Sequence, residues 1–166
     1  YYTITYEGED YQIEKGITEE LVKISTIDDL QDLEDNSKRI ILPYNKQIQR
    51  TLDGSGKKVD ANIIAEEELK QEYPGTYEYF EATSGELATR EKGDGANYEP
   101  WYKYGREQGL EYIGERLYTP TYSSGPKFMY DETEYSLFSN GYAVFPDTVD
   151  LEVLNRTLNS KVMDYY

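Results

Sequence analysis

The 166-residue chain contains no cysteine and no histidine. The missing cysteine excludes disulfides, thiolate nucleophiles and Cys/His zinc sites, and the missing histidine excludes every mechanism that depends on an imidazole base. The absence of cysteine is compatible with a reducing cytoplasm, where we expect the protein to act. No apolar run approaches the roughly 20 residues that span a bilayer, so we expect no membrane partner. Because the chain starts at Tyr1 rather than methionine, we expect a fragment of a longer protein.

Phenylalanine and tryptophan are scarce, with 4 Phe and 1 Trp against 19 Tyr. The aromatic mass of a core must therefore come largely from tyrosine, and each buried tyrosine hydroxyl needs a hydrogen-bond partner. We expect a core whose rim is rich in side-chain hydrogen bonds. The length fits one domain, and the recurrence of apolar and aromatic residues argues against global disorder.

Positive charge is also scarce, since the net charge is −16. This balance argues against DNA binding, because Lys and Arg contacts to phosphate supply most non-specific affinity. The acidic residues are concentrated in residues 1–37, which hold 11 acidic and 2 basic side chains, a net of −9. Residues 38–58 hold 6 basic side chains against 1 acidic one, a net of +5, and residues 101–130 hold 4 against 3, a net of +1. An ordinary solvated charged surface is the alternative interpretation.

Apolar periodicity and turn signals predict short strands and short helices. We expect strands at residues 1–6, 11–13, 38–44, 115–118, 127–130, 136–138 and 142–145. We expect helices at residues 18–23, 66–72 and 75–90, a helical turn at 100–109, and a last helix with Leu151, Leu154 and Leu158 on its apolar side, capped by Asp147 or Thr148. Together these elements predict an α+β single domain with a twisted, mostly antiparallel sheet and short flanking helices.

Glycine, proline and asparagine mark the expected turns. Residues 53–58 suit a hairpin tip or exposed loop, because they match neither a phosphate-binding loop nor a calcium loop. Ser124-Gly125-Pro126 marks another turn, and Asn140-Gly141 is a good hairpin signal. In the polar loop of residues 25–37, Ile27 and Leu30 are the expected anchors.

Several short motifs recur in a characteristic order. They are Ile13-Glu14, Ser25-Thr26-Ile27, residues 39–44, Trp101, Gly105-Arg106-x-Gln108, Thr119-Pro120, Lys127-Phe128, Asn140-Gly141-Tyr142, Leu154 and residues 158–161. In this order they resemble the C-terminal target-recognition domain of adenine-specific DNA methyltransferases from type II restriction–modification systems, including the TaqI-like specificity domains. The resemblance covers nearly the whole chain.

The resemblance implies that residues 1–166 form a DNA target-recognition domain. Its partners would be double-stranded DNA and the methyltransferase domain of the same polypeptide, which would bind S-adenosylmethionine and methylate one adenine. This chain has neither the Asn/Asp-Pro-Pro-Tyr/Phe loop of that chemistry nor a glycine-rich strand–turn–helix for the cofactor. We therefore expect no catalytic, cofactor-binding or metal-binding residue in this chain. We expect the parent protein to be a site-specific adenine DNA methyltransferase, either with or without endonuclease activity.

Two segments contain the residues that we expect to contact DNA. The loop and strand at Tyr122, Ser123, Ser124 and Lys127 can project into a groove, and small hydroxyls can contact phosphate. The second set follows Pro43-Tyr44 and continues past the expected turn: Lys46, Gln47, Gln49, Arg50, Lys57 and Lys58. We expect a cationic cleft or rim near these loops.

Arg106 and Gln108 have the chemistry to read guanine and adenine edges. Because both belong to the shared motif, we favour Arg106 as either a phosphate contact or a buried ion-pair partner rather than a base reader. Trp101, Tyr102 and Tyr104 have the rings to stack on a base, but helical spacing of aromatic residues favours a place in the core.

Two other classes of function compete with DNA recognition. A carbohydrate- or protein-binding β-rich module would suit the tyrosine content and acidity, but it does not explain the ordered motifs. A glycoside hydrolase with paired carboxylates is weakly supported, because 33 acidic residues always supply some pair. Binding to duplex DNA that weakens steeply with salt would distinguish a DNA module from a lectin.

Overall fold

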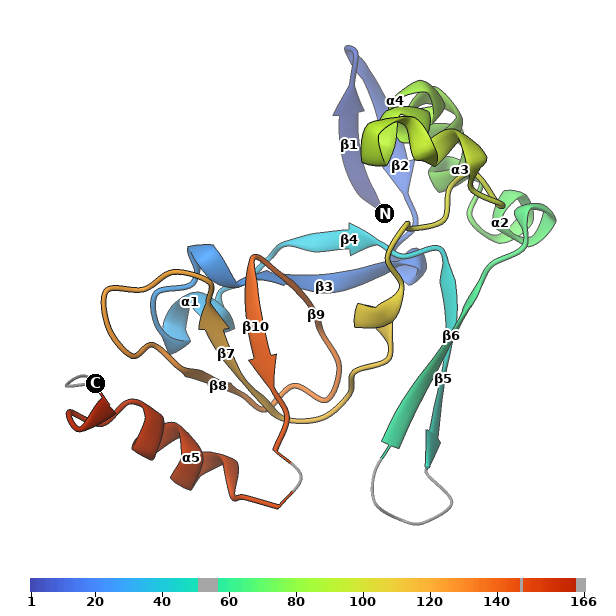
Figure 1. Ribbon diagram of the computed structural model, residues 1–166. Coiled ribbons are helices and arrows are strands. Elements are labelled where there is room, and N and C mark those ends of the chain that lie inside the picture. The colour runs from blue at the N-terminus through green and yellow to red at the C-terminus, as the bar shows by residue number, and fades with distance from the viewer. Residues whose placement is uncertain (51–56, 147, 164–166) are drawn as a thin grey trace. The chain divides into compact units, whose positions relative to one another are not determined.

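The computed structural model describes residues 1–50, 57–146 and 148–163, and the side chains of Arg50, Lys57 and Gln108 lie outside that description. The described strands are β1 Tyr2–Tyr6, β2 Glu9–Ile13, β3 Thr18–Lys23, β4 Arg39–Ile41, β5 Tyr44–Arg50, β6 Lys57–Ile63, β7 Arg116–Pro120, β8 Met129–Asp131, β9 Leu137–Ser139 and β10 Gly141–Val144 (Figure 1). The described α-helices are α1 Leu30–Glu34, α2 Glu66–Glu72, α3 Pro74–Ala82, α4 Ser84–Thr89 and α5 Leu151–Leu158. Short 3-10 helices are η1 Lys15–Ile17, η2 Ile24–Thr26, η3 Arg90–Asn97 and η4 Gln108–Leu110.

The expected α+β class is confirmed. The strands are divided among small sheets with the orders β1–β2, β10–β7–β8, β4–β3–β9 and β5–β6. Strand β2 pairs antiparallel with β1, and β7 pairs antiparallel with both β8 and β10, whereas β3 and β9 are parallel. None of the described helices has the length and apolar character needed to cross a lipid bilayer.

The chain folds into two compact units. The first comprises residues 1–19, 41–49 and 59–111, and the second comprises residues 20–40, 50–58 and 112–166. The first unit contains the β1–β2 hairpin with α3 packed beside β2 (Figure 1). Its core consists of the buried side chains of Ile13, Ile17, Ile64, Leu69, Phe80 and Tyr102.

Tyrosine hydroxyls bond the core of the first unit to its backbone, as the composition predicted. Tyr102 is 2% exposed and donates to the carbonyl of Ile64 at 2.7 Å, while Tyr104 donates to the carbonyl of Ile41. Trp101 packs against the same core. The core interpretation of Trp101, Tyr102 and Tyr104 is therefore confirmed over base stacking.

A carboxylate from another segment caps helix α3. Pro74 is at its first turn, as expected, and the Glu14 carboxylate accepts hydrogen bonds from the backbone N–H groups of Gly75 and Thr76, both at 2.9 Å. Burial by itself raises the pKa of Glu14, but the hydrogen bonds from the Thr76 hydroxyl and these N–H groups lower it by more, so the net pKa lies below its ordinary value. A negative charge at a helix N-terminus is stabilising.

The second unit contains the β10–β7–β8 sheet, most of the β4–β3–β9 sheet and helix α5, which contacts β7 and β8. Its core is formed by the buried side chains of Val22, Ile24, Ile27, Tyr118 and Met129. The hydroxyl of Tyr118 shares a hydrogen bond with the hydroxyl of Ser136 at 2.8 Å. The four strands predicted after residue 114 are confirmed to within one or two residues.

The expected helix at residues 18–23 is wrong, because this segment is strand β3. Leu21 pairs with Leu137 and Val22 pairs with Phe138 in parallel register. The apolar spacing fits a helix locally, but the segment is the central strand between β4 and β9 and gains its hydrogen bonds and burial from both.

The helix expected at residues 75–90 is divided. Helix α3 ends at Ala82 and α4 begins at Ser84, and between them the Thr83 hydroxyl donates to the carbonyl of Tyr79 at 2.9 Å. The helical turn expected from Pro100 is also wrong, because residues 101–107 form turns and bends until η4 begins. The aromatic side chains there are held by tertiary packing rather than by a helical repeat.

Several boundary and turn predictions also change. Strand β4 ends at Ile41, so Pro43 separates β4 from β5 rather than ending one long strand. Of the hairpin tip or exposed loop expected at residues 53–58, residues 53–56 lie outside the described residues. Lys57 and Lys58 are not in a turn, because they begin strand β6, which pairs with β5. Ile27 is 3% exposed and is an anchor, whereas Leu30 is 54% exposed and is not.

Asn140-Gly141 does not form a hairpin, because β9 pairs with β3 and β10 pairs with β7. The last helix is capped by Asp150, whose side chain accepts from the Val153 N–H at 2.9 Å, rather than by Thr148. The alternative cap, Asp147, lies outside the described residues.

Candidate functional site

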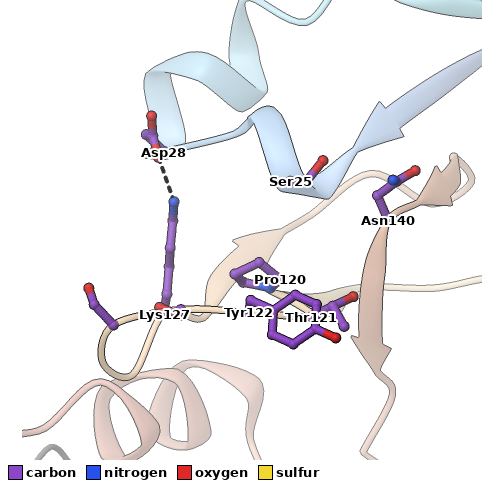
Figure 2. Close-up of a pocket in the computed structure, with 9 residues that line it drawn as sticks. Ser25, Asp28, Pro120, Thr121, Tyr122, Lys127 and Asn140 are labelled. Carbon is purple, nitrogen blue, oxygen red and sulfur yellow. Dashed lines mark hydrogen bonds and ion pairs between the residues drawn. The ribbon is translucent and has the colours of Figure 1, made fainter.

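Four of the predicted DNA contacts meet in one surface hollow of the second unit. The hollow has a volume of about 450 Å³ and is lined by Ser25, Asp28, Pro120, Thr121, Tyr122, Ser123, Ser124, Lys127 and Asn140 (Figure 2). Its lining is rich in hydroxyl groups and contains one amide, one ammonium and one carboxylate. Such groups can donate to and accept from a polar ligand, and the ammonium can pair with an anion.

The loop between β7 and β8 forms one side of the hollow. It begins after Pro120, and the Ser123 hydroxyl bonds to the backbone of Gly125 in the same loop. This local bond holds the turn that Ser124-Gly125-Pro126 predicted. Tyr122 is 92% exposed on this loop, so its ring is available to a partner rather than used in the core.

Lys127 is positioned through the backbone of the next residue, Phe128, which is hydrogen-bonded to Asn159. The N–H of Phe128 donates to the Asn159 side chain at 2.9 Å, and the Asn159 amide donates back to the carbonyl of Phe128 at 2.8 Å. Asn159 follows the last residue of α5, so this helix end fixes the segment that carries Lys127. Two motifs of the family resemblance, Lys127-Phe128 and the run at 158–161, therefore bond to each other.

The ammonium of Lys127 points to Asp28, as Figure 2 shows, with 2.7 Å between Lys127 Nζ and Asp28 Oδ1. The hydrogen bond and charge of Lys127 lower the pKa of Asp28. The hollow is therefore not the cationic rim that the sequence led us to expect. Its cation is matched by an anion from the acidic segment 1–37, which the charge pattern had placed away from DNA.

Asn140 enters the hollow from the start of β10 (Figure 2). It has a positive φ of 58°, which asparagine tolerates better than most residues. The next residue must be glycine, because a Cβ on Gly141 would lie 2.7 Å from both Ile24 Cγ2 and the carbonyl oxygen of Thr119. Tertiary contact rather than hairpin formation thus explains the Asn140-Gly141 motif.

The sequence did not identify five of the residues that line this hollow. Ser25, Pro120 and Asn140 lie in motifs of the family resemblance, and Thr121 follows one of them, so position within the motifs was the available signal. Asp28 had no such signal, because nothing in the sequence places it opposite Lys127.

The other basic candidates do not line the hollow. Lys46 forms an ion pair with Glu19, and Gln47 and Gln49 are exposed on β5. Lys58 is exposed on β6 and interacts with other protein groups. The side chains of the remaining candidates lie outside the described residues: Arg50, Lys57 and Gln108. DNA contact by this set stays a prediction.

Arg106 lies in the first unit, where it lines a separate hollow of about 380 Å³ with Arg90, Glu91, Tyr98, Tyr104 and Gly105. Its side chain is exposed, so the alternative of a buried ion-pair partner is wrong. The neighbouring Arg90 instead has the structural role, because its guanidinium donates to the carbonyls of Leu87, Trp101 and Lys103. Phosphate contact by Arg106 stays a prediction.

Arg116 was counted among the positive charges near DNA, but it is 0% exposed. Its guanidinium donates to the carbonyls of Thr133, Glu134 and Ser136 at 2.6 to 3.1 Å. Its Nε lies 3.8 Å from the Asp131 carboxylate. The residue therefore holds the segment between β8 and β9 rather than facing a ligand. Among the described residues, no group of three or more His, Cys, Asp or Glu side chains is placed to hold a metal ion.

No protein-family model matches the chain. A curated protein of Escherichia coli, the type II restriction enzyme and methyltransferase RM.Eco57I, is 26% identical to it over 178 aligned positions. The chain is thus related to a restriction–modification protein. The alignment covers 97% of this chain and 17% of the length of that relative.

Proposed function

We propose that this chain is the DNA sequence-recognition module of a type II restriction–modification enzyme that methylates adenine at N6. In this proposal it is a TaqI-like target-recognition domain, and a separate domain of the same polypeptide binds S-adenosylmethionine and transfers the methyl group. The observation that carries the proposal is the alignment of 97% of this chain with 17% of a protein named as restriction enzyme and methyltransferase. The lack of a methyl-transfer loop in the sequence fits a module that recognises rather than reacts.

The hollow around Lys127 supports this role. Protein–DNA interfaces place hydroxyls, amides and ammonium groups against the phosphate–sugar backbone to fix the register of the duplex. Lys127, Ser123 and Ser124 supply these groups from the loop between β7 and β8, which Asn159 at the end of α5 holds through the backbone of Phe128. We assign Lys127 to phosphate contact and the exposed ring of Tyr122 to the DNA surface next to it.

The net charge of −16 means that such a module would bind DNA weakly alone. Specific binding would then depend on contacts placed correctly beside the methyltransferase domain. A cytoplasmic location, where chromosomal DNA is accessible in bacteria, is part of the proposal.

Equilibrium binding of the chain to a fluorescent DNA duplex tests this function. We expect affinity to fall steeply between about 50 and 200 mM salt, because each phosphate contact releases counterions. Lys127→Ala should weaken binding, whereas Lys23→Ala, an exposed lysine on β3 that does not line the hollow, is the matched control.

Circular dichroism would verify that each variant is folded. In the parent enzyme, Lys127→Ala and Arg50→Ala should each raise the DNA concentration needed for methylation. Duplex binding that is absent at low salt, or that does not change with salt, would contradict the proposal and favour a carbohydrate- or protein-binding module.

A further inference from the structure

The ion pair between Lys127 and Asp28 occupies the ammonium that we assign to phosphate contact. Lys127 is 28% exposed, whereas the side chain of Asp28 is 89% exposed and touches the hollow. A carboxylate and a phosphate present similar oxygen acceptors to an ammonium. On the proposed function, the Asp28 carboxylate would therefore compete with a phosphate oxygen for Lys127.

The backbone of Asp28 is anchored beside the hollow. Ile27, immediately before it, is buried in the core of the second unit. The Asp28 N–H donates to the Asp32 carboxylate at 2.8 Å, and the next residue, Asp29, caps helix α1 by accepting from the Asp32 N–H at 3.0 Å. A residue anchored in this way stays beside the hollow even when its ion pair breaks.

The ion pair is weak enough to be exchanged. Exposed ion pairs gain little net stability, because water and salt screen them and both side chains lose conformational freedom. A DNA phosphate carries a full negative charge within a dense array of others, so it competes well for one ammonium. Exchange would leave the Asp28 carboxylate next to the bound phosphate, where the two negative charges repel.

We propose that Asp28 acts as a built-in phosphate mimic that occupies Lys127 in the absence of DNA and opposes non-specific binding at this hollow. The inference rests on the proposed DNA-recognition function. Its ligand is a backbone phosphodiester of duplex DNA. Opening the pair then costs free energy on every duplex, and random DNA, which offers few other contacts to offset this cost, binds weakly.

The inference predicts how salt dependence changes in Asp28→Asn. In the wild-type protein the freed carboxylate keeps a cation near the phosphate, so this contact releases few ions. With asparagine, Lys127 contributes a full phosphate contact, and the slope of log affinity against log salt should steepen by about 0.9. Between about 50 and 200 mM salt, a fourfold change, affinity for random duplex should fall about 3.5-fold more than in the wild type.

The experiment measures the affinity of the 166-residue chain for a random-sequence duplex across a salt series. It compares the wild type with Asp28→Asn, Lys127→Ala, the double variant and a control, Glu34→Gln. Glu34 is an exposed acidic residue at the end of α1 that does not line the hollow, so it reports the effect of net charge alone.

We expect Asp28→Asn to bind more tightly at low salt and to show the steeper slope, and we expect this gain to vanish when Lys127 is also replaced. An equal gain in Glu34→Gln, or one that persists without Lys127, would mean that net charge is responsible and would overturn the inference. Salt-dependent binding that Asp28→Asn leaves unchanged would also overturn it while leaving the proposed function intact. If neither the wild type nor Asp28→Asn binds duplex at low salt, the proposed function itself fails.

Discussion

Replacing Arg116 by methionine should destabilise the protein severely. Methionine keeps a flexible apolar stem but removes the guanidinium that bonds three carbonyls between β8 and β9. It also removes the cation beside Asp131, which is 4% exposed. The three carbonyls would then lose this donor, and the buried Asp131 carboxylate would lose its cation and keep only its hydrogen bonds from the Thr133 N–H and the Ser136 hydroxyl.

The size of the effect follows from the burial of the pair. Removing one partner of a buried ion pair typically costs about 3–5 kcal/mol, because the remaining charge is left uncompensated. A small domain has a total unfolding free energy of about 5–15 kcal/mol, so this loss is a large fraction of the whole. The distance of 3.8 Å from Nε to Asp131 is long for a hydrogen bond, so the carbonyl bonds carry much of the loss.

Urea denaturation followed by circular dichroism measures the loss. Arg116→Lys should have an intermediate effect, because an ammonium keeps the charge but cannot match the three-carbonyl geometry. Arg106→Ala, an exposed arginine in the other unit, should leave the unfolding free energy unchanged. If Arg116→Met does not fold, Arg116→Lys still gives a measurable value. An unfolding free energy within about 1 kcal/mol of wild type for Arg116→Met would refute the structural role, since a buried pair should cost more.

Two further predictions concern close packing and pH. Gly141→Ala should lower the free energy of unfolding by about 1–3 kcal/mol, because its Cβ would collide with Ile24 and a backbone carbonyl. Gly85→Ala in α4 is the control and should stabilise the protein slightly, because its Cβ would meet nothing within 4 Å. Thermal melting of the two variants and the wild type measures both effects. Because the folded pKa of Glu14 is lowered from 4.5, its stabilisation is present above pH 4.5 and is lost as the pH falls through the folded pKa. Glu14→Gln should therefore be less stable than wild type at neutral pH, with a gap that narrows below pH 4.5 in pH-dependent urea melts; a constant gap would contradict this.

Much of the fold was predictable because it depends on local patterns. The strands after residue 114 and helix α2 follow from short-range periodicity and turn residues, and the tyrosine-rich composition required the hydroxyl bonds seen at Tyr102 and Tyr118. The α+β class follows from the same information. The loop at Tyr122–Lys127 was also identifiable, because hydroxyl-rich turns next to a strand are recognisable in sequence.

Strand β3 was not predictable, because its hydrogen-bonding partner β9 comes late in the chain and its apolar spacing suits either structure. The Asn140-Gly141 motif reads as a hairpin until Ile24 and Thr119 are seen to crowd Gly141. In both cases a contact between distant segments overrides the local preference.

The sequence by itself determined which residue types are present to contact a polyanion and on which loop they lie. Only the tertiary structure decided which charges are available. It buries Arg116 and brings Asp28 to Lys127, 99 residues away in the chain. The physical reason is that charge acts through space, so the sign of a surface depends on neighbours that the fold selects rather than on neighbours in sequence.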